Sequence, residues 1–229
     1  MSSACLFSGG KDSTLALHKA VGLGIGVDLL ITMRSANRES YMFHYPNVEL
    51  TELQAEALGM RHVFSDTEGR KEEELDDLEE ALRSNDVKLL VTGATSSKYQ
   101  ADRINAIARK LGIEHIAPLW RIDPVEELNE IASRYEAIIT SVSAEGLSPS
   151  LLGKRIDGKV IEELKEANRK RGVNLVFEGG EAETLVLDAP MFKEKLVIEK
   201  AHTEVSGNNG TYLIERARLA NKKAQVGDD

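Results

Sequence analysis

Apolar and polar residues along the first two thirds of the chain follow the order expected of buried strands joined by helices. Short apolar runs alternate with longer stretches in which apolar residues recur at helical spacing. The strand candidates are residues 4–7, 28–33, 62–64, 89–91, 114–117 and 137–142, and the helix candidates are residues 13–21, 48–58, 71–82, 100–111 and 124–135. This alternation predicts an α/β, doubly wound fold with a mostly parallel sheet of about five strands and helices on both faces.

A different pattern begins near residue 143. We expect a loop over residues 144–154, a helix over 159–171, and strands over 174–177, 181–187, 195–205 and 211–218. The polar, glycine-containing segment 206–210 predicts a hairpin turn. The chain therefore divides into a domain over residues 1–143 and a smaller C-terminal α+β lobe over residues 144–229. Because no linker-like segment separates them, the boundary is soft, and a crevice between the lobes is the natural ligand site.

Composition and charge narrow the class of protein. Hydrophobic residues make up 41% and charged residues 29% of the 229 positions, as in globular proteins. The formal net charge of −9 works against binding to phosphate backbones, so no nucleic-acid partner is expected. The single cysteine, Cys5, lies in an apolar run, where burial is favoured over reactivity. No apolar stretch approaches the roughly 18 to 20 residues that span a bilayer, so we expect a cytoplasmic protein with no membrane partner.

Residues 8–13, Ser-Gly-Gly-Lys-Asp-Ser, stand between the first strand and the first helix. The two glycines allow close approach of an anion, which the amide hydrogens and dipole of the helix N-terminus face. Lys11 adds positive charge, and Ser8 and Ser13 add hydroxyl donors. Asp12 is placed to cap the helix or to help hold Mg²⁺. The segment predicts a phosphate-binding loop, with a plain glycine turn capped by Asp12 as the alternative.

Two common nucleotide motifs are absent from this loop. A Walker A motif requires glycine where Cys5 stands and serine or threonine where Asp12 stands. The Gly-x-Gly-x-x-Gly fingerprint is absent there as well. A GTPase or kinase of the Walker type and a dinucleotide-binding enzyme are therefore excluded.

The loop resembles the pyrophosphate loop of the N-type ATP pyrophosphatases, which include GMP synthetase, argininosuccinate synthetase and tRNA-modifying enzymes. The resemblance implies a HUP (adenine nucleotide alpha hydrolase-like) domain that adenylates a carbonyl or carboxylate oxygen. It implies that the loop holds the phosphates that leave as pyrophosphate, while Mg²⁺ offsets the charge developing on them. The cofactors implied are ATP and Mg²⁺.

Further segments stand in a characteristic order and spacing: residues 39–44 with Asn47, 92–94, 97–100 with Arg103, 118–120, 143–147, 152–157 and 178–184. Together they resemble the diphthine-ammonia ligase family, the ATP-dependent amidases that complete diphthamide on translation elongation factor 2. The resemblance extends to about residue 190, and Glu-Gly-Gly-Glu at 178–181 is its most specific part. Many relatives have glycine immediately before this segment, where this chain has Phe177.

The candidate site residues fall into three groups. Those assigned to ATP binding are Ser8, Gly9, Gly10, Lys11, Asp12, Ser13, Met33 and Gly93. Those assigned to the substrate are Tyr41, His44, Asn47, Tyr99, Gln100, Arg103, Arg155 and Glu178. Those assigned to catalysis are Lys11, Asp12, Glu181 and Glu183, with Asp12 also the candidate Mg²⁺ ligand.

Several of these positions have a structural alternative. Glu181 and Glu183 are two apart on a strand candidate and so point to one face, where carboxylates suit Mg²⁺ or accept a proton from ammonium. Composition alone favours a solvated turn and strand edge, and the family resemblance favours the functional interpretation. Tyr99 and Arg103 begin a helix at the carboxyl edge of the sheet, where packing and a solvated face compete with ligand binding. A lone histidine such as His44 is more often a surface residue.

The activity implied by the resemblance is amidation of a carboxylate through an acyl-adenylate. Diphthine on elongation factor 2 and ammonium would yield diphthamide, AMP and pyrophosphate. No glutaminase domain is recognisable, so free ammonium is the implied nitrogen source. Another pyrophosphatase activity, such as tRNA thiolation or lysidine formation, and a non-catalytic ATP-binding module are the alternatives, and a homo-oligomer is left open.

Overall fold

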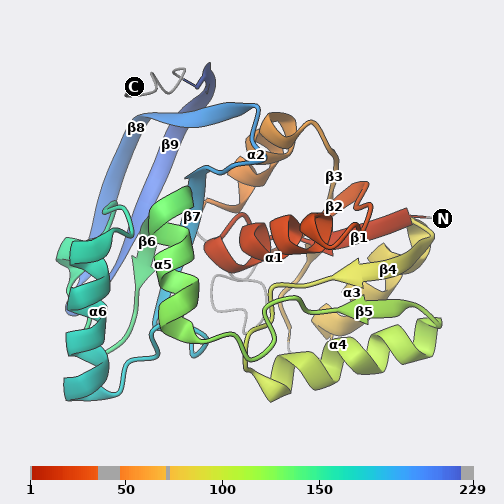
Figure 1. The fold of residues 1–229 in the computed structure, drawn as a ribbon, viewed down its shortest axis with the longest axis horizontal. Coiled ribbons are helices and arrows are strands. Elements are labelled where there is room, and N and C mark those ends of the chain that lie inside the picture. Colours follow the sequence, from red (N-terminus) through yellow and green to blue (C-terminus); the bar gives the residue numbers. More distant parts are fainter. Residues whose placement is uncertain (1, 36–46, 71–72, 223–229) are drawn as a thin grey trace.

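The computed structural model describes residues 2–35, 47–70 and 73–222 and contains two sheets. Figure 1 shows strands β1 to β5 on the right and β6 to β9 on the left, with helix α1 in the centre. The larger part of the chain is thus an α/β fold, and the second sheet forms a smaller lobe beside it.

The first sheet has five parallel strands in the order β3-β2-β1-β4-β5. Its central strand pairs on both sides, with Ala4 opposite Leu29 and opposite Leu90. All three of these side chains are fully buried, as strands covered on both faces require. The strands are β1 (Ser2–Leu6), β2 (Leu29–Ser35), β3 (Arg61–Thr67), β4 (Val87–Val91) and β5 (Glu114–Ile116). The parallel sheet predicted from the sequence is confirmed.

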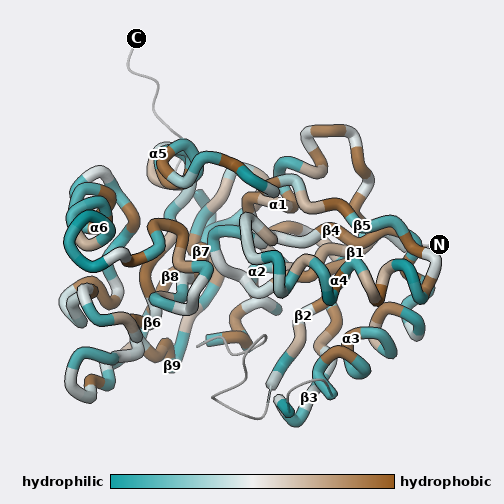
Figure 2. The backbone as a smooth tube through the Cα atoms, turned by 90° about the horizontal axis from the view of Figure 1, so that it is seen from below, coloured by the Kyte–Doolittle hydropathy of each residue, from teal (hydrophilic) through white to brown (hydrophobic). Residues whose placement is uncertain are grey.

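Helices cover both faces of this sheet. Leu15 on α1 and Ala55 on α2 belong to the core cluster shared with the second lobe. Leu78 on α3 and Ile104 on α4 belong to a separate cluster with the side chains on the other face of the same strands. Figure 2 shows the apolar residues along the inner strands and the hydrophilic residues on outward turns of the helices. The helices are α1 (Lys11–Gly22), α2 (Thr51–Leu58), α3 (Glu73–Ser84), α4 (Lys98–Leu111) and α5 (Pro124–Arg134).

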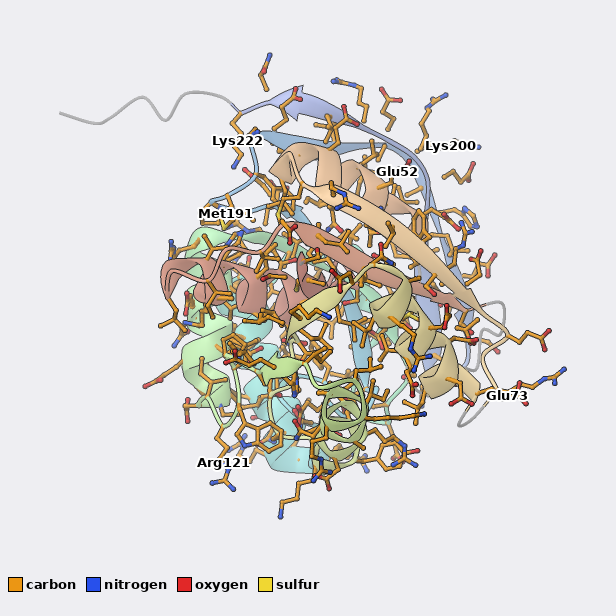
Figure 3. All side chains as sticks on the ribbon, turned by 90° about the vertical axis from the view of Figure 1, so that its right-hand side faces the viewer. Glu52, Glu73, Arg121, Met191, Lys200 and Lys222 are labelled. Atoms are coloured by element: carbon orange, nitrogen blue, oxygen red, sulfur yellow. The ribbon has the colours of Figure 1, made fainter. Side chains whose placement is uncertain are left out.

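The second lobe is built on an antiparallel sheet in the order β7-β6-β9-β8. Helix α6 packs against it through Val160, Ile161 and Leu164, which are buried in the shared core. Figure 3 shows charged side chains such as Lys200 on this lobe and Glu73 on α3 directed outward. The elements are β6 (Glu136–Val142), α6 (Gly158–Arg171), β7 (Ala182–Asp188), β8 (Glu194–Ser206) and β9 (Asn209–Asn221), with short 3-10 helices at η1 (Val48–Leu50) and η2 (Pro149–Leu151).

Two predicted elements differ from the structure. The strand expected at 137–142 forms as β6, but it pairs antiparallel with β7 and β9 instead of joining the parallel sheet. A buried strand has the same continuous apolar pattern in either kind of sheet, so the sequence could not assign it. The strand expected at 174–177 is a turn, in which Asn174 Oδ1 accepts a hydrogen bond from the Val176 amide. The division of the chain at residue 143 stays a prediction.

Within the described residues, no helix combines the length and the apolar character needed to cross a bilayer.

Candidate functional site

The glycine loop connects β1 to α1 and is closed by its own serines. The Ser8 amide donates to Ser13 Oγ at 3.2 Å, and the two hydroxyl oxygens are 3.1 Å apart. Ser13 Oγ in turn donates to the Gly10 carbonyl at 3.2 Å. Gly9 has a φ of 77°, in the region that favours glycine. The segment lies between the first strand and the first helix, as predicted, and its binding of phosphate stays a prediction.

Strand β7 of the second lobe packs directly against this loop. The Lys11 amide donates to Thr184 Oγ1 at 3.1 Å, and the Val186 amide donates to the Gly9 carbonyl at 3.0 Å. A Cβ added at Gly10 would lie 3.2 Å from both oxygens of Thr184. The loop therefore takes part of its shape from a strand that follows it by more than 170 positions, as the Lys11–Thr184 separation of 173 shows.

Gly93 lies where the end of β4 meets the first turn of α1. A Cβ at this position would come within 2.8 Å of the Asp12 carbonyl carbon and of the Ser13 nitrogen. These are backbone atoms, which cannot rotate away. The sequence placed Gly93 at the nucleotide site, and the structure places it against the loop with a steric reason for glycine.

The Lys11 ammonium lies inside the molecule, 1% exposed, and contacts oxygens from three parts of the chain. Its Nζ forms an ion pair with Asp12 and lies 3.1 Å from Glu127 Oε1 and 2.9 Å from the Val176 carbonyl. It also lies 5.6 Å from the centre of the Phe177 ring. Burial lowers the Lys11 pKa, but the charges of Asp12 and Glu127 outweigh it, so the net pKa is raised. Lys11 is therefore a charged residue held beneath the loop.

Glu127 is the site residue that the sequence did not single out. It lies on α5, which begins at Pro124 because Asp123 caps the amides of Val125 and Glu126. Glu127 is 0% exposed, and its Oε2 finds no hydrogen-bond partner among the described residues. A carboxylate on the buried side of a helix, one residue before Leu128, was the available signal.

Carboxylates outnumber cations in this cluster of Lys11, Asp12, Glu127 and Glu183. Burial, opposed by Lys11 and aided by Asp12, raises the pKa of Glu127 to about 8. Burial and the charge of Asp12 likewise raise the pKa of Glu183 to about 8, against the effect of Lys11. The cluster therefore holds protons, or attracts further positive charge, near neutral pH.

Glu178 and Glu181 instead bind backbone amides. The Glu178 carboxylate accepts hydrogen bonds from the amides of residues 95–97 and from Ser96 Oγ, just before α4. Burial works to raise its pKa, but these bonds outweigh burial and lower it. Glu181 precedes β7, and its carboxylate accepts from the amides of Asn174 and Gly179. The strand expected to begin at Glu181 begins at Ala182, so only Glu183 of the two lies on β7, where it interacts with Asp12. The catalytic role of both residues stays a prediction.

Two family models match almost the whole chain in succession. The model described as diphthamide synthase N-terminal domain matches residues 1–115, and the diphthamide synthase C-terminal domain matches residues 123–220. The chain belongs to the diphthamide synthase family. Its relatives are ligases that form carbon–nitrogen bonds, and the chain is an enzyme of that class.

Individual relatives of this family are similar over most of this chain. The diphthine–ammonia ligase of Rattus norvegicus is 32% identical over 96% of this chain and 91% of its own. The Homo sapiens enzyme of the same name is 31% identical over 90% and 85%. The Schizosaccharomyces pombe enzyme is 31% identical over 95% of this chain but only 39% of its own length. A solved chain described as a predicted subunit of tRNA methyltransferase from Methanocaldococcus jannaschii is 18% identical, with a TM-score of 0.44 and coverage of 83% and 98%.

Phe177 is the position at which the resemblance to the family leads us to expect glycine. Its φ of 66° lies in the left-handed region, where glycine is unstrained. The ring is 6% exposed and packs toward the Lys11 ammonium. Cation–π attraction and burial therefore offset the backbone strain of a large residue here.

The other residues predicted to bind substrate or ATP lie in different parts of the fold. The Arg103 guanidinium lies 3.5 Å from the centre of the Tyr99 ring, at the start of α4, and the Gln100 amide bonds to the capping Ser97 Oγ. Met33 is 2% exposed, in the apolar core. Tyr41 and His44 lie outside the described residues.

Asn47 and Arg155 bind backbone rather than facing the loop. Asn47 exchanges hydrogen bonds with β9, to the Tyr212 carbonyl at 3.0 Å and from the Ile214 amide at 2.7 Å. Arg155 donates to the carbonyls of Ala132 and Tyr135 at the end of α5. Each of the two side chains therefore joins elements of the fold, and their predicted contact with substrate stays a prediction.

Proposed function

We propose that this chain uses ATP to activate a carboxylate as an acyl-adenylate and transfers the acyl group to ammonia, with diphthine on translation elongation factor 2 as the carboxylate substrate. The observation that carries the proposal is the glycine loop at the N-terminus of α1, which is hydrogen-bonded to β7 and has the buried Lys11 beneath it. This loop occurs in a chain of the diphthamide synthase family.

ATP is proposed to place its β- and γ-phosphates on the loop over residues 8–13. The N-terminus of α1 presents amide hydrogens and the positive end of the helix dipole to these anions. Lys11 acts from beneath the loop, where the low dielectric strengthens its attraction for the leaving pyrophosphate. Met33 and Gly93 are proposed to shape the rest of the nucleotide site.

The acidic residues suit Mg²⁺ only together with ATP. In the part of the chain that the structure describes, no group of three or more His, Cys, Asp or Glu is arranged to hold a metal. Mg²⁺ in nucleotide sites takes about one or two protein carboxylates and completes its coordination with phosphate oxygens and water. Asp12, with its side chain 34% exposed at the mouth of the loop, fits that requirement. When bound, Mg²⁺ would offset the charge that develops on the departing pyrophosphate.

The reaction proceeds in two proposed steps. An oxygen of the substrate carboxylate attacks the α-phosphorus, the bond to the β-phosphate oxygen breaks, and pyrophosphate leaves. Ammonia then attacks the acyl carbon, AMP leaves with the electron pair of the acyl–oxygen bond, and the nitrogen loses a proton. Ammonium must first be deprotonated, and Glu183 is proposed to accept that proton because its pKa is raised to about 8.

The protein substrate is proposed to approach the carboxyl edge of the first sheet. Tyr99, Gln100 and Arg103 open α4 at this edge, and Glu178 orders the loop before it. Tyr41 and His44 follow β2 in the sequence and are proposed to complete the substrate site, while Asn47 and Arg155 support its walls. The proposed partners are elongation factor 2 and ammonium in the cytoplasm, with neither nucleic acid nor membrane.

The test is a pyrophosphate-release assay with ATP, ammonium and elongation factor 2 that carries unamidated diphthine. We expect release that depends on the factor, together with conversion of the modified histidine to the amide, seen by mass spectrometry of that peptide. The matched control is factor that already carries diphthamide. ATP binding without release from any of these mixtures would indicate a non-catalytic nucleotide-binding module, and release driven by tRNA instead would indicate another pyrophosphatase activity.

A further inference from the structure

Gln54 on α2 is fully buried and joins the glycine loop to the second lobe. Its Nε2 donates one hydrogen bond to the Gly9 carbonyl at 2.9 Å and another to the Val186 carbonyl at 2.7 Å. Because both partners can only accept, the amide nitrogen must face them, which settles the orientation of the side chain. One side chain thus bonds the backbones of both lobes.

The contact with Val186 completes the outer edge of a sheet. Strand β7 is an edge strand in the order β7-β6-β9-β8, so its outward backbone groups have no neighbouring strand. The Val186 amide donates to the Gly9 carbonyl at 3.0 Å, and the Val186 carbonyl accepts from Gln54. The loop and the glutamine therefore occupy the place of an adjacent strand. The Gly9 carbonyl accepts from the Val186 amide and from Gln54 Nε2.

Packing alone does not favour glutamine at position 54. Its Oε1 is buried and has no hydrogen-bond partner among the described residues, and an unpaired buried oxygen is unfavourable. Methionine would fill a similar volume without that oxygen. A Cβ added at Gly9 would lie 2.2 Å from Gln54 Oε1, so the glutamine also requires a glycine in the loop. What glutamine supplies, and an apolar residue does not, is the pair of donors.

Holding the Gly9 carbonyl also directs the next amide. The carbonyl of Gly9 and the N–H of Gly10 belong to one peptide group, in which they point in opposite directions because the bond is trans. With the carbonyl bound toward β7, the Gly10 amide faces away from β7 and donates a long hydrogen bond to Ser8 Oγ at 3.4 Å. In the proposed function this side faces the phosphates, and a phosphate oxygen would replace Ser8 Oγ as the acceptor of the Gly10 amide hydrogen.

We propose that Gln54 is a positioning residue for ATP, which keeps the Gly9–Gly10 peptide in the orientation that presents its amide hydrogen to the phosphates. The inference rests on the proposed function of the loop. Gln54 does not touch the nucleotide itself, since it is enclosed on the far side of the loop. Its effect is therefore expected in the binding of ATP and not in the binding of the protein substrate.

The test compares Gln54→Met with Leu58→Met, a volume-conserving change in the buried part of the same helix. We expect Gln54→Met to weaken ATP binding about tenfold by titration calorimetry and to raise KM for ATP by a similar factor, with KM for the protein substrate unchanged. Gln54→Glu keeps the shape of the side chain but turns an acceptor toward two carbonyl oxygens. Its loss of ATP affinity should therefore be larger than that of Gln54→Met. Leu58→Met should bind ATP as the unaltered protein does.

ATP affinity and KM that stay at the unaltered value in a folded Gln54→Met variant would overturn the inference. A loss that appears equally in KM for both substrates, in step with a lowered Tm, would also overturn it, because it would show a general structural role. Calorimetry measures ATP binding without the protein substrate, so it separates this inference from the proposed reaction. If the unaltered protein binds ATP but forms no amide, the proposed function fails while the role of Gln54 is still decided.

Discussion

The Lys11 ammonium lies 3.1 Å from the Glu127 carboxylate, and the two side chains are 1% and 0% exposed. A charge removed from water to this extent depends on its partners, because breaking a buried pair leaves an uncompensated ion. Glu127 comes from α5, so the helix that leads into the second lobe determines where the charge beneath the glycine loop lies.

Replacing Glu127 should therefore have graded effects. Glu127→Leu removes the acceptor and is expected to lower the free energy of unfolding by about 3 kcal/mol and to impair ATP turnover, because Lys11 loses its anchor. Glu127→Gln should lower stability and turnover less, since the amide oxygen still accepts from Lys11. Glutamine is also neutral, as Glu127 is when it is protonated. Urea denaturation and AMP release measure the two effects. Glu126→Leu, an exposed position on the same helix, is the control, and an equal loss in both leucine variants would contradict the role of the pair.

Replacing Glu183 should affect the reaction rate, whereas replacing Glu181 should affect stability. Glu183→Gln removes the proposed acceptor of the ammonium proton and is expected to slow amide formation about 100-fold. Glu181→Gln leaves one oxygen for the amides of Asn174 and Gly179 and should lower stability by about 1 kcal/mol with little change in rate. Single-turnover amidation and thermal unfolding distinguish the two. If Glu181→Gln is the slower variant, the assignment of proton transfer to Glu183 is wrong.

Stability should fall as the pH rises toward the alkaline side. The pKa of Glu183 and that of Glu127 are each raised from 4.5 to about 8, so the folded state holds their protons more tightly than the unfolded state. Their contribution is complete below pH 4.5 and is lost as the pH rises through about 8. Denaturation at about pH 6 and about pH 9 should show this loss, and Glu183→Gln should reduce it. Identical pH dependence in the two proteins would show that Glu183 titrates normally.

Gly93→Ala should damage the site by sterics alone. The added Cβ would meet backbone atoms of Asp12 and Ser13 at 2.8 Å, so the first turn of α1 must shift. We expect a loss of about 1 to 3 kcal/mol in stability and weaker binding of ATP. Gly26→Ala is the matched control, because a Cβ at Gly26 meets nothing within 4 Å. Unchanged ATP affinity in a folded Gly93→Ala variant would show that the loop does not depend on this approach.

The family and the parallel sheet were predictable because their signals are local. The turn at Gly9 and Gly10, the N-terminus of α1 and the apolar runs of β1, β2 and β4 depend on neighbouring residues and on backbone geometry. The same local reasoning was wrong at β6, because a buried strand is equally apolar in a parallel and an antiparallel sheet. It also placed Glu181 on a strand that begins one residue later, and a strand pattern cannot indicate that the Glu181 carboxylate accepts from the Asn174 amide.

By itself, then, the sequence determined where the glycine loop between the first strand and the first helix forms and which family the motifs resemble. The tertiary structure alone decided what surrounds that loop. Gln54, Glu127 and Thr184 reach it from separations of 45, 116 and 173 residues. Their own segments read as ordinary helix or strand, because hydrogen bonds and charges act through space and only the packed chain brings these groups within a few ångströms of one another.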